Sequence, residues 1–265
     1  MKVSVCGCGW LGLPLAENLV SRGDTVRGSK RDVAEAAALG DRGIEGFVFD
    51  LANSEKTSPA FFDSDAVIVN IAPGRKTVNG EAFARLMKGW LERLATKSKC
   101  NLLFISTTSV YGEPTGTVTE RTVPVPQTES GKAHLTIEKA VQQYFGERAT
   151  ILRLSGLIGE DRHPAKFLAG RQLADGDQPV NLIHREDVIA AIKNILDLGV
   201  WGEMLHLSAQ DNPARASYYC WSAGKLGLEK PVFEPGGQDA KVIDATSTLE
   251  KLGLVLKYPS PYDML

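Results

Sequence analysis

The chain has 265 residues, enough to bury a large core as one enlarged domain or as two lobes that share a cleft. Its 30 basic and 32 acidic residues give a net charge of −2, so no broad electrostatic field favours nucleic acid or an anionic membrane as a partner. No apolar run approaches the ~20 residues that span a bilayer, and the N-terminus lacks the pattern of a signal peptide. We therefore expect a cytoplasmic protein.

The cysteines and histidines show no metal-binding spacing. The four cysteines form no pair of C-x-x-C knuckles, and the four histidines form no H-E-x-x-H arrangement. We expect no metal site, and we expect the cysteines to be small buried side chains in a reducing compartment.

A nucleotide-binding unit is predicted at the N-terminus. The apolar run Val3 to Cys6 is followed by Gly7-Cys8-Gly9-Trp10-Leu11-Gly12 and then by a helical pattern. In this order Gly7 allows a sharp turn, Gly9 lets a pyrophosphate approach the backbone, and Gly12 lets the helix pack closely on the sheet. The free N–H groups at the helix start then face the phosphates, where the helix dipole favours negative charge.

Strands and helices alternate after this loop. A second run, Thr25 to Gly28, follows and completes the β-α-β unit that a dinucleotide fingerprint requires. The continuous apolar run Ala66 to Ala72 is typical of a strand covered on both faces. The alternation predicts an α/β fold with a Rossmann-type, doubly wound parallel sheet. Beyond the first strand, the expected strands are 25–28, 46–51, 66–72, 102–105 and 150–154, and the expected helices are 33–39, 81–97 and 135–145.

The residue composition of the chain changes beyond Gly159. Residues 160–178 are rich in charge and glycine, a helical pattern returns at 188–198, and the last sixty residues are rich in proline, with a candidate short strand at 205–207. We expect residues 1–158 to form the dinucleotide domain, with 180–200 returning to it. Residues 159–179 and 201–265 are expected to form a smaller substrate-binding lobe.

A cluster of hydroxyl side chains follows the strand expected at 102–105. Ser106-Thr107-Thr108-Ser109-Val110-Tyr111-Gly112 would stand at the carboxyl end of the sheet, where ligands bind in open α/β folds. Together with the glycine loop, this run resembles the extended short-chain dehydrogenase/reductase superfamily, the NAD(P)-dependent epimerase and dehydratase group. The resemblance covers essentially the whole chain and also rests on Asp50, Asn70-Ile71-Ala72, residues 153–159, residues 183–188, and residues 252–254 with 258–260.

The resemblance implies that a Ser or Thr, a Tyr and a Lys do the catalytic work. Thr107 matches the Ser/Thr position, but the Tyr-x-x-x-Lys pair is absent: Ser130 stands at the tyrosine position and His134 at the lysine position. An alkyl hydroxyl is a far weaker acid than a phenol, so Ser130 needs a strong partner to act as a base. His134 could supply a charge or a ribose hydrogen bond, or have no role. Tyr111 is a further candidate near the substrate, its alternative being a packing aromatic.

The end of the second strand distinguishes the two dinucleotides. NAD-preferring members have Asp or Glu there, whereas this chain reads Gly28-Ser29-Lys30-Arg31, with no carboxylate before Asp32. A hydroxyl and two cations favour the 2′-phosphate of NADP over NAD, the alternative being that the cations are a solvated loop pair. The expected cofactor contacts are Gly7, Gly9, Trp10, Leu11, Gly12, Ser29, Lys30, Arg31, Asp50, Leu51, Ile71, Ala72, Ser106, His134 and Leu154.

Two functions fit these features. The first is an NAD(P)-dependent oxidoreductase or epimerase acting on a nucleotide sugar or another small carbonyl or alcohol compound, in which Thr107 polarises the substrate oxygen and Tyr111, Ser130 or water transfers the proton. The second is a catalytically reduced dinucleotide-binding sensor or interaction protein. The hydroxyl cluster and a complete C-terminal lobe lead us to favour the enzyme. A small-molecule substrate is the expected partner, and a homodimer through residues 81–97 and 135–145 is open.

Overall fold

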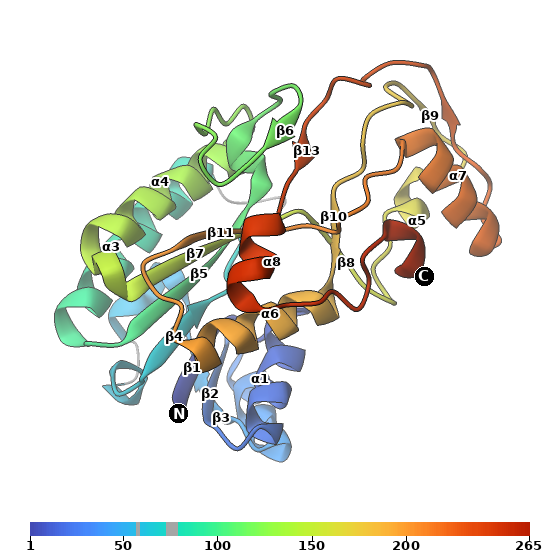
Figure 1. The fold of residues 1–265 in the computed structure, drawn as a ribbon. Coiled ribbons are helices and arrows are strands. Elements are labelled where there is room, and N and C mark those ends of the chain that lie inside the picture. Colours follow the sequence, from blue (N-terminus) through green and yellow to red (C-terminus); the bar gives the residue numbers. More distant parts are fainter. Residues whose placement is uncertain (57–58, 73–78) are drawn as a thin grey trace.

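The central sheet has seven parallel strands in the computed structural model, which describes residues 1–56, 59–72 and 79–265 (Figure 1). Its order is β11-β7-β5-β4-β1-β2-β3, so the chain starts in the middle, runs to one edge and then crosses back to fill the other half. This reversal places a crevice at the carboxyl ends of β1 and β4, the usual ligand position in such folds. The strands are β1 Lys2–Cys6, β2 Thr25–Lys30, β3 Glu45–Val48, β4 Ala66–Val69, β5 Asn101–Thr107, β7 Ala149–Leu154 and β11 Met204–Leu207. The predicted Rossmann-type sheet is confirmed.

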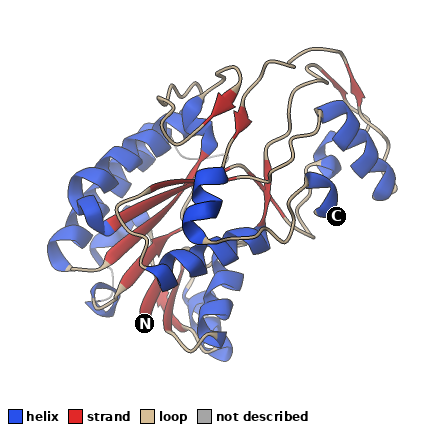
Figure 2. Ribbon diagram, in the orientation of Figure 1, coloured by secondary structure: helices blue, strands red, loops and turns tan. Residues whose placement is uncertain are grey.

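Helices cover both faces of the sheet (Figure 2). The strand β4 shows why its sequence is apolar throughout: Ala66 and Ile68 pack into the core under α1 and α6, while Val67 and Val69 pack into the core under α3 and α4. Successive side chains of a strand point to opposite faces, so a strand with two covered faces needs apolar residues at every position. The helices are α1 Gly12–Ser21, α2 Val33–Ala37, α3 Gly80–Lys97, α4 Glu129–Phe145, α5 Ala165–Leu168, α6 Arg185–Leu198, α7 Arg215–Lys225 and α8 Thr246–Leu252.

A smaller lobe lies at the end of the molecule opposite α3 and contains α5 and α7 (Figure 1). It has its own core, in which Tyr218 and Tyr219 pack with Val180, Leu182 and Met264. Short parallel pairs of strands accompany this lobe and its connections to the sheet: β8 Gly156–Ile158 with β10 Leu182–His184, β9 Gln172–Leu173 with β12 Val232–Phe233, and β6 Thr117–Val118 with β13 Val242–Ile243.

The structure differs from the expected division of the chain in one respect. The strand β11 pairs with β7 as the last strand of the main sheet, and Leu249 and Leu252 of α8 pack into the core beside it. These segments lie within residues 201–265, which were expected to form part of the smaller lobe. The helix α6 returns the chain to the open edge of the sheet, where a parallel strand can still be added.

The helix α4 begins six residues before the predicted start at Leu135. The side chain of Thr128 accepts a hydrogen bond from the N–H of Gly131 at 3.0 Å and so caps the helix ahead of its first apolar residues. This earlier start places Ser130 in the first turn of the helix.

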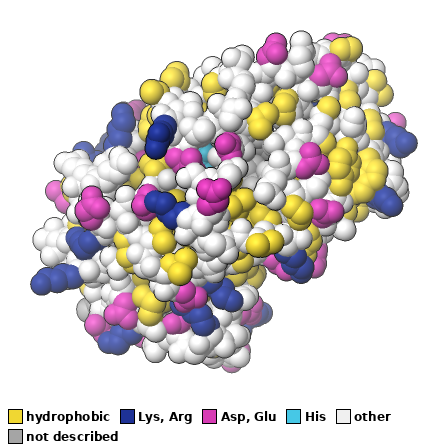
Figure 3. Space-filling view, viewed as in Figure 1, with side chains coloured by type: hydrophobic (Ala, Val, Ile, Leu, Met, Phe, Trp, Pro, Cys, Tyr) yellow, Lys and Arg dark blue, Asp and Glu magenta, His cyan; other side chains and the backbone are white. Residues whose placement is uncertain are grey.

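The visible surface mixes acidic and basic side chains without a large patch of one sign (Figure 3). None of the described helices combines the length and the apolar character needed to cross a bilayer.

Candidate functional site

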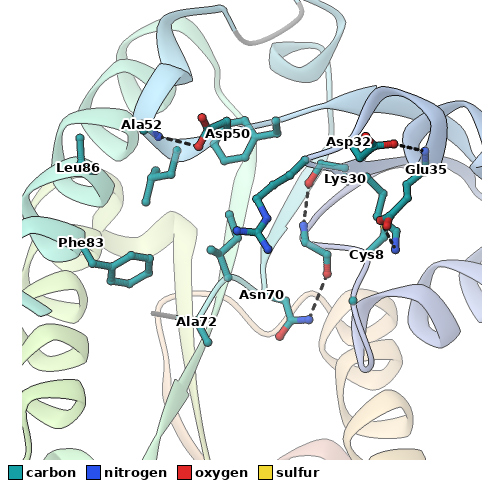
Figure 4. A pocket seen from close by; sticks show the side chains of 17 residues that line it. Cys8, Lys30, Asp32, Glu35, Asp50, Ala52, Asn70, Ala72, Phe83 and Leu86 are labelled. Carbon is teal, nitrogen blue, oxygen red and sulfur yellow. Dashed lines mark hydrogen bonds and ion pairs between the residues drawn. The ribbon is translucent and has the colours of Figure 1, made fainter. Parts of the chain in front are cut away.

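A cavity of about 580 Å³ opens at the carboxyl ends of β1, β2 and β4 (Figure 4). Its size lies in the range of ligand-binding clefts, roughly 300 to 1,000 Å³. The predicted cofactor residues that line it are Gly7, Gly9, Ser29, Lys30, Arg31, Asp50, Leu51, Ile71 and Ala72. It is also lined by residues that the sequence did not indicate as contacts, namely Cys8, Asp32, Glu35, Phe49, Ala52, Asn70, Phe83 and Leu86.

The glycine loop has the geometry of a phosphate cradle. Gly7 has a φ of +103°, and a Cβ there would lie 2.5 Å from the carbonyl oxygen of Asn70. A Cβ on Gly12 would lie 2.1 Å from the carbonyl oxygen of Gly7, whereas a Cβ on Gly9 would meet nothing within 4 Å. The N–H groups of Trp10, Leu11 and Gly12 have no acceptor among the described residues. Open space beside Gly9 and free donors at the start of α1 fit the pyrophosphate of a dinucleotide.

Ser29 holds the glycine loop against β2. Its Oγ accepts the N–H of Gly7 at 2.8 Å and donates toward the Sγ of Cys6 at 4.0 Å, and the residue is buried. The hydroxyl is therefore already used within the protein, which is a different role from the predicted contact to a 2′-phosphate.

The two cations that follow Ser29 have different surroundings. The Nζ of Lys30 lies 3.3 Å from Oε2 of Glu35 on α2. Arg31 is exposed, and no carboxylate of the described residues lies within ion-pair distance of it. The nearby carboxylate of Asp32 accepts the N–H of Glu35 at 3.0 Å and caps α2 (Figure 4). Arg31 is thus a cation on the cavity wall that forms no ion pair with the described residues.

The opposite wall of the cavity comes from the segment that follows β3 and from α3 (Figure 4). Asp50 accepts the N–H of Ala52 at 3.1 Å and the side-chain amide of Asn53 at 2.7 Å. These bonds form a turn, and β3 accordingly ends at Val48, earlier than predicted. Phe83 and Leu86 supply an apolar surface from α3; their helical spacing was the signal that could have placed both on one face.

Trp10 connects the glycine loop to the segment that enters the lobe. Its indole N–H donates to the carboxylate of Asp161 at 2.8 and 2.9 Å. The guanidinium groups of Arg185 and Arg162 lie 4.5 and 5.2 Å from its ring centroid. Trp10 and Leu11 do not line the cavity; Leu11 packs into the core.

The catalytic turn predicted after β5 is built around Thr107. Its Oγ1 accepts the N–H of Ser109 at 3.1 Å and donates to the Oγ of Ser109 at 3.0 Å. Ser109 is exposed, and its own hydroxyl proton has no acceptor among the described residues. The sequence analysis included Ser109 only as one member of the hydroxyl cluster. In the structure Ser109 is the residue of the Thr107–Ser109 pair that can still donate its proton.

Tyr111 is 1% exposed and lies below this turn. Its hydroxyl accepts from Nη1 of Arg153 at 2.6 Å, lies 3.1 Å from the carbonyl oxygen of Thr119 and contacts Nε2 of His206. Burial raises the pKa of Tyr111 to about 12. This position favours the packing role over proton transfer to a substrate.

Ser106 and Leu154 are also buried away from the cavity. The Oγ of Ser106 donates to Oε1 of Glu138 at 2.6 Å, and Glu138 forms a buried ion pair with Arg153, Oε2 to Nη2, at 2.6 Å. Leu154 packs into the core on the α1 side of the sheet. Neither side chain reaches the cavity wall.

Ser130 and His134 form a pair one turn apart on α4. Nδ1 of His134 lies 2.8 Å from the carbonyl oxygen of Ser130 and 3.5 Å from its Oγ. His134 is buried, and this burial lowers its pKa, so the ring is neutral at pH 7. A neutral imidazole cannot supply the positive charge of a lysine, which leaves a hydrogen bond as the contribution open to it.

A family described as NAD(P)H-binding matches residues 7–198 of the chain. Protein YeeZ of Escherichia coli K12 is 35% identical over 271 residues, covering 99% of this chain and 98% of that protein. The fold is shared with UDP-glucuronic acid 4-epimerase from Bacillus cereus in complex with NAD, with a TM-score of 0.82 at 20% identity over 100% of this chain and 94% of that one. A short-chain dehydrogenase/reductase protein from Agrobacterium tumefaciens with bound NAD has a TM-score of 0.81 at 20% identity, covering 100% and 95%. The chain therefore belongs to the NAD(P)H-binding family, and it shares its fold with the epimerase and the short-chain dehydrogenase/reductase protein.

Proposed function

We propose that the protein binds NADP(H) in preference to NAD(H) and acts as an oxidoreductase or epimerase on a small carbonyl or alcohol compound, the nucleotide sugars being one such class. The observation that carries the preference is Arg31, a guanidinium on the wall of the cavity, next to Lys30, that no carboxylate of the described residues pairs with. A carboxylate at the end of β2 would repel a 2′-phosphate, whereas a guanidinium can bind it with two hydrogen bonds.

The residues of the cavity have separate tasks toward the dinucleotide. The N–H groups of residues 10–12 would hold the pyrophosphate at the start of α1. Arg31 and Lys30 would bind the 2′-phosphate, with Lys30 leaving Glu35 in exchange. Leu51 and Phe83 offer apolar surface to the adenine. When bound, the nicotinamide supplies or accepts a hydride at a substrate carbon.

Proton transfer to the substrate oxygen is assigned to the pair of hydroxyls at the catalytic turn. Because Thr107 donates to Ser109, the proton of Ser109 is free for a substrate oxygen, and Thr107 can replace it along the 3.0 Å hydrogen bond. Ser130 is a second exposed hydroxyl at the start of α4. Because alkyl hydroxyls are weak acids, solvent returns a proton to Thr107 and so completes the transfer.

Calorimetric titration of the protein with NADPH and with NADH tests the cofactor preference. We expect tighter binding of NADPH, and we expect Arg31→Gln to weaken NADPH binding by about tenfold while leaving NADH binding unchanged, since a charged hydrogen bond contributes about 1.5 to 3 kcal/mol. Arg121→Gln, which removes an exposed arginine outside the cavity, is the matched control. Equal affinities for the two dinucleotides, or equal losses in Arg31→Gln, would refute the preference.

A dinucleotide-binding sensor is the second candidate function, and the neutral, buried His134 favours it. With serine and a neutral imidazole at the Tyr and Lys positions, α4 carries no phenol and no ammonium group there. A panel of carbonyl and alcohol compounds, followed by the absorbance of NADPH, separates the two functions. Turnover that collapses in Thr107→Ala and Ser109→Ala at unchanged NADPH affinity supports the enzyme. NADPH binding without turnover across the panel supports the sensor.

The sequence left open a homodimer through α3 and α4, and the composition of these helices bears on that question. The outward positions of these helices are mostly polar or charged, with Leu86 as an apolar exception: Glu81, Arg85, Lys88, Glu92, Lys132, Thr136, Lys139 and Gln143. Because stable homodimer interfaces are more apolar than the average surface, this composition favours a monomer. Light scattering on the purified protein decides between the two masses.

A further inference from the structure

A second cavity, of about 220 Å³, lies between the catalytic turn and the smaller lobe. Thr108 and Ser109 form one side of it, and Arg215 and Tyr219 on the first two turns of α7 form another. The remaining walls are the segment that leads into β10 and the residue that precedes β13. Together these are Gln178, Pro179, Val180, Asn181, Leu182 and Lys241.

The lining of the cavity is positively charged. Two of its described residues, Arg215 and Lys241, are cations, and none is a carboxylate. Nη1 of Arg215 donates to Oε1 of Gln178 at 3.0 Å and to the carbonyl oxygen of Ala174 at 3.3 Å, both neutral acceptors. A guanidinium has five N–H donors in a planar fork. The guanidinium lies 5.5 Å from the ring centroid of Phe233, and its Nε and Nη2 donate to no described residue, so they are available to a ligand.

Lys241 brings a second charge to the same space. Its Nζ donates to the carbonyl oxygen of Gly112 and lies 3.5 Å from Oε1 of the exposed Glu113. An ammonium group has three donors, so one of them is left over. The Tyr219 hydroxyl makes no hydrogen bond to any described residue, although its side chain is largely buried. The cavity thus offers donors from α7 and from the residue before β13.

The volume of the cavity suits a small anionic group. At about 220 Å³ it is smaller than the clefts of roughly 300 to 1,000 Å³ that enclose larger ligands. A carboxylate or phosphate with a few attached carbons fits this volume. Ser109 belongs both to this wall and to the hydroxyl pair with Thr107. A group held in the cavity would therefore keep the neighbouring carbon of the same molecule beside the catalytic turn.

We propose that this cavity binds the anionic group, a carboxylate or a phosphate, of a small carbonyl or alcohol substrate. Arg215 binds two of its oxygens and Lys241 places a point charge against it, as these two side chains do in other anion sites. The proposal rests on the proposed function for the nature of the reacting group. Anion binding itself does not depend on turnover and can be measured alone.

Calorimetric titration with inorganic phosphate and, separately, with oxalate tests the site, at constant ionic strength and with NADPH present. We expect saturable binding of at least one probe, weakened by about tenfold or more in Arg215→Gln and in Lys241→Gln. Tighter phosphate than oxalate binding indicates a phosphorylated substrate, and the reverse order indicates a carboxylic acid. Lys225→Gln on the same helix, outside the cavity, is the matched control and should bind as the unchanged protein does.

The outcomes separate this proposal from the proposed function. Binding of neither probe, or an equal loss in Lys225→Gln, overturns the anion site. Anion binding that depends on Arg215 in a protein without preference for NADPH leaves the site standing and removes the cofactor proposal. Since Lys241 also bonds to the backbone of Gly112, Arg215→Lys serves as a second variant that keeps the charge. The Arg215→Lys variant should fold but should no longer bind two oxygens of the anion at once. Unchanged affinities for oxalate and phosphate in this variant would also contradict the proposed role of Arg215.

Discussion

The ion pair of Glu138 and Arg153 gives the sharpest test of how this fold is stabilised. Both side chains are almost fully buried, with exposed fractions of 2% and 4%. The carboxylate accepts from Nε at 3.0 Å and from Nη2 at 2.6 Å, and it also accepts from the hydroxyl of Ser106 at 2.6 Å. The remaining Nη1 donates to Tyr111. Every polar atom of this pair has a partner, so removing one side leaves the other charge buried without compensation.

We expect Glu138→Met to lower the free energy of unfolding by about 3 to 5 kcal/mol, the usual cost of breaking a buried pair. At roughly 2 °C for each kcal/mol in a chain of this size, the melting temperature falls by roughly 6 to 10 °C. Arg153→Met should cost a similar amount. Because the double variant buries no charge, we expect it to be more stable than either single variant, with a coupling energy of about 2 kcal/mol or more.

Urea unfolding followed by circular dichroism at pH 7 measures these differences. Lys132→Met is the matched control, since Lys132 pairs with Glu129 at 3.0 Å on the same helix but at exposed positions of 56% and 74%. An exposed pair contributes about 0 to 1 kcal/mol. If Glu138→Met is as mild as this control, or if the double variant is no more stable than the singles, burial of the pair does not have the energetic weight that we assign to it.

Two further predictions concern the histidine and tyrosine side chains of the core. Tyr111→Phe should lower stability by about 1 to 3 kcal/mol, because Nη1 of Arg153 loses its acceptor, and should leave NADPH affinity unchanged; a variant of normal stability that loses turnover would assign Tyr111 to catalysis instead. Burial lowers the pKa of His163 to about 4, so the unfolded chain takes up its proton near pH 6.5 while the folded chain does not. Stability from this residue is complete above about pH 6.5 and is lost as the pH falls toward 4. In His163→Gln the fall in the urea midpoint between pH 7.5 and pH 5 should be smaller than in the unchanged protein, and an equal fall would contradict this linkage.

The fold and the dinucleotide cradle could be predicted because their signals are local. The glycines at positions 7, 9 and 12 constrain the backbone within one loop, and the apolar run of β4 reports that both faces of its strand are covered. The positive charge at the end of β2 likewise comes from two adjacent residues, Lys30 and Arg31. Such features depend on backbone conformation and side-chain period, which a short stretch of sequence contains.

The partners of individual side chains were decided by the tertiary structure. Ser29 was predicted to contact phosphate, and its hydroxyl accepts the N–H of Gly7. For Tyr111 the sequence left a catalytic and a packing role open, and its hydroxyl accepts from Arg153 in the interior. Arg215 and Lys241 meet Ser109 at one cavity although more than a hundred residues separate them from it. The sequence by itself determined the parallel sheet and the glycine loop. Only the tertiary structure decided which hydroxyls are free, which charges are paired and where the second cavity lies. The connections between strands bring segments together that are distant in the sequence, and burial and hydrogen bonding depend on that packing.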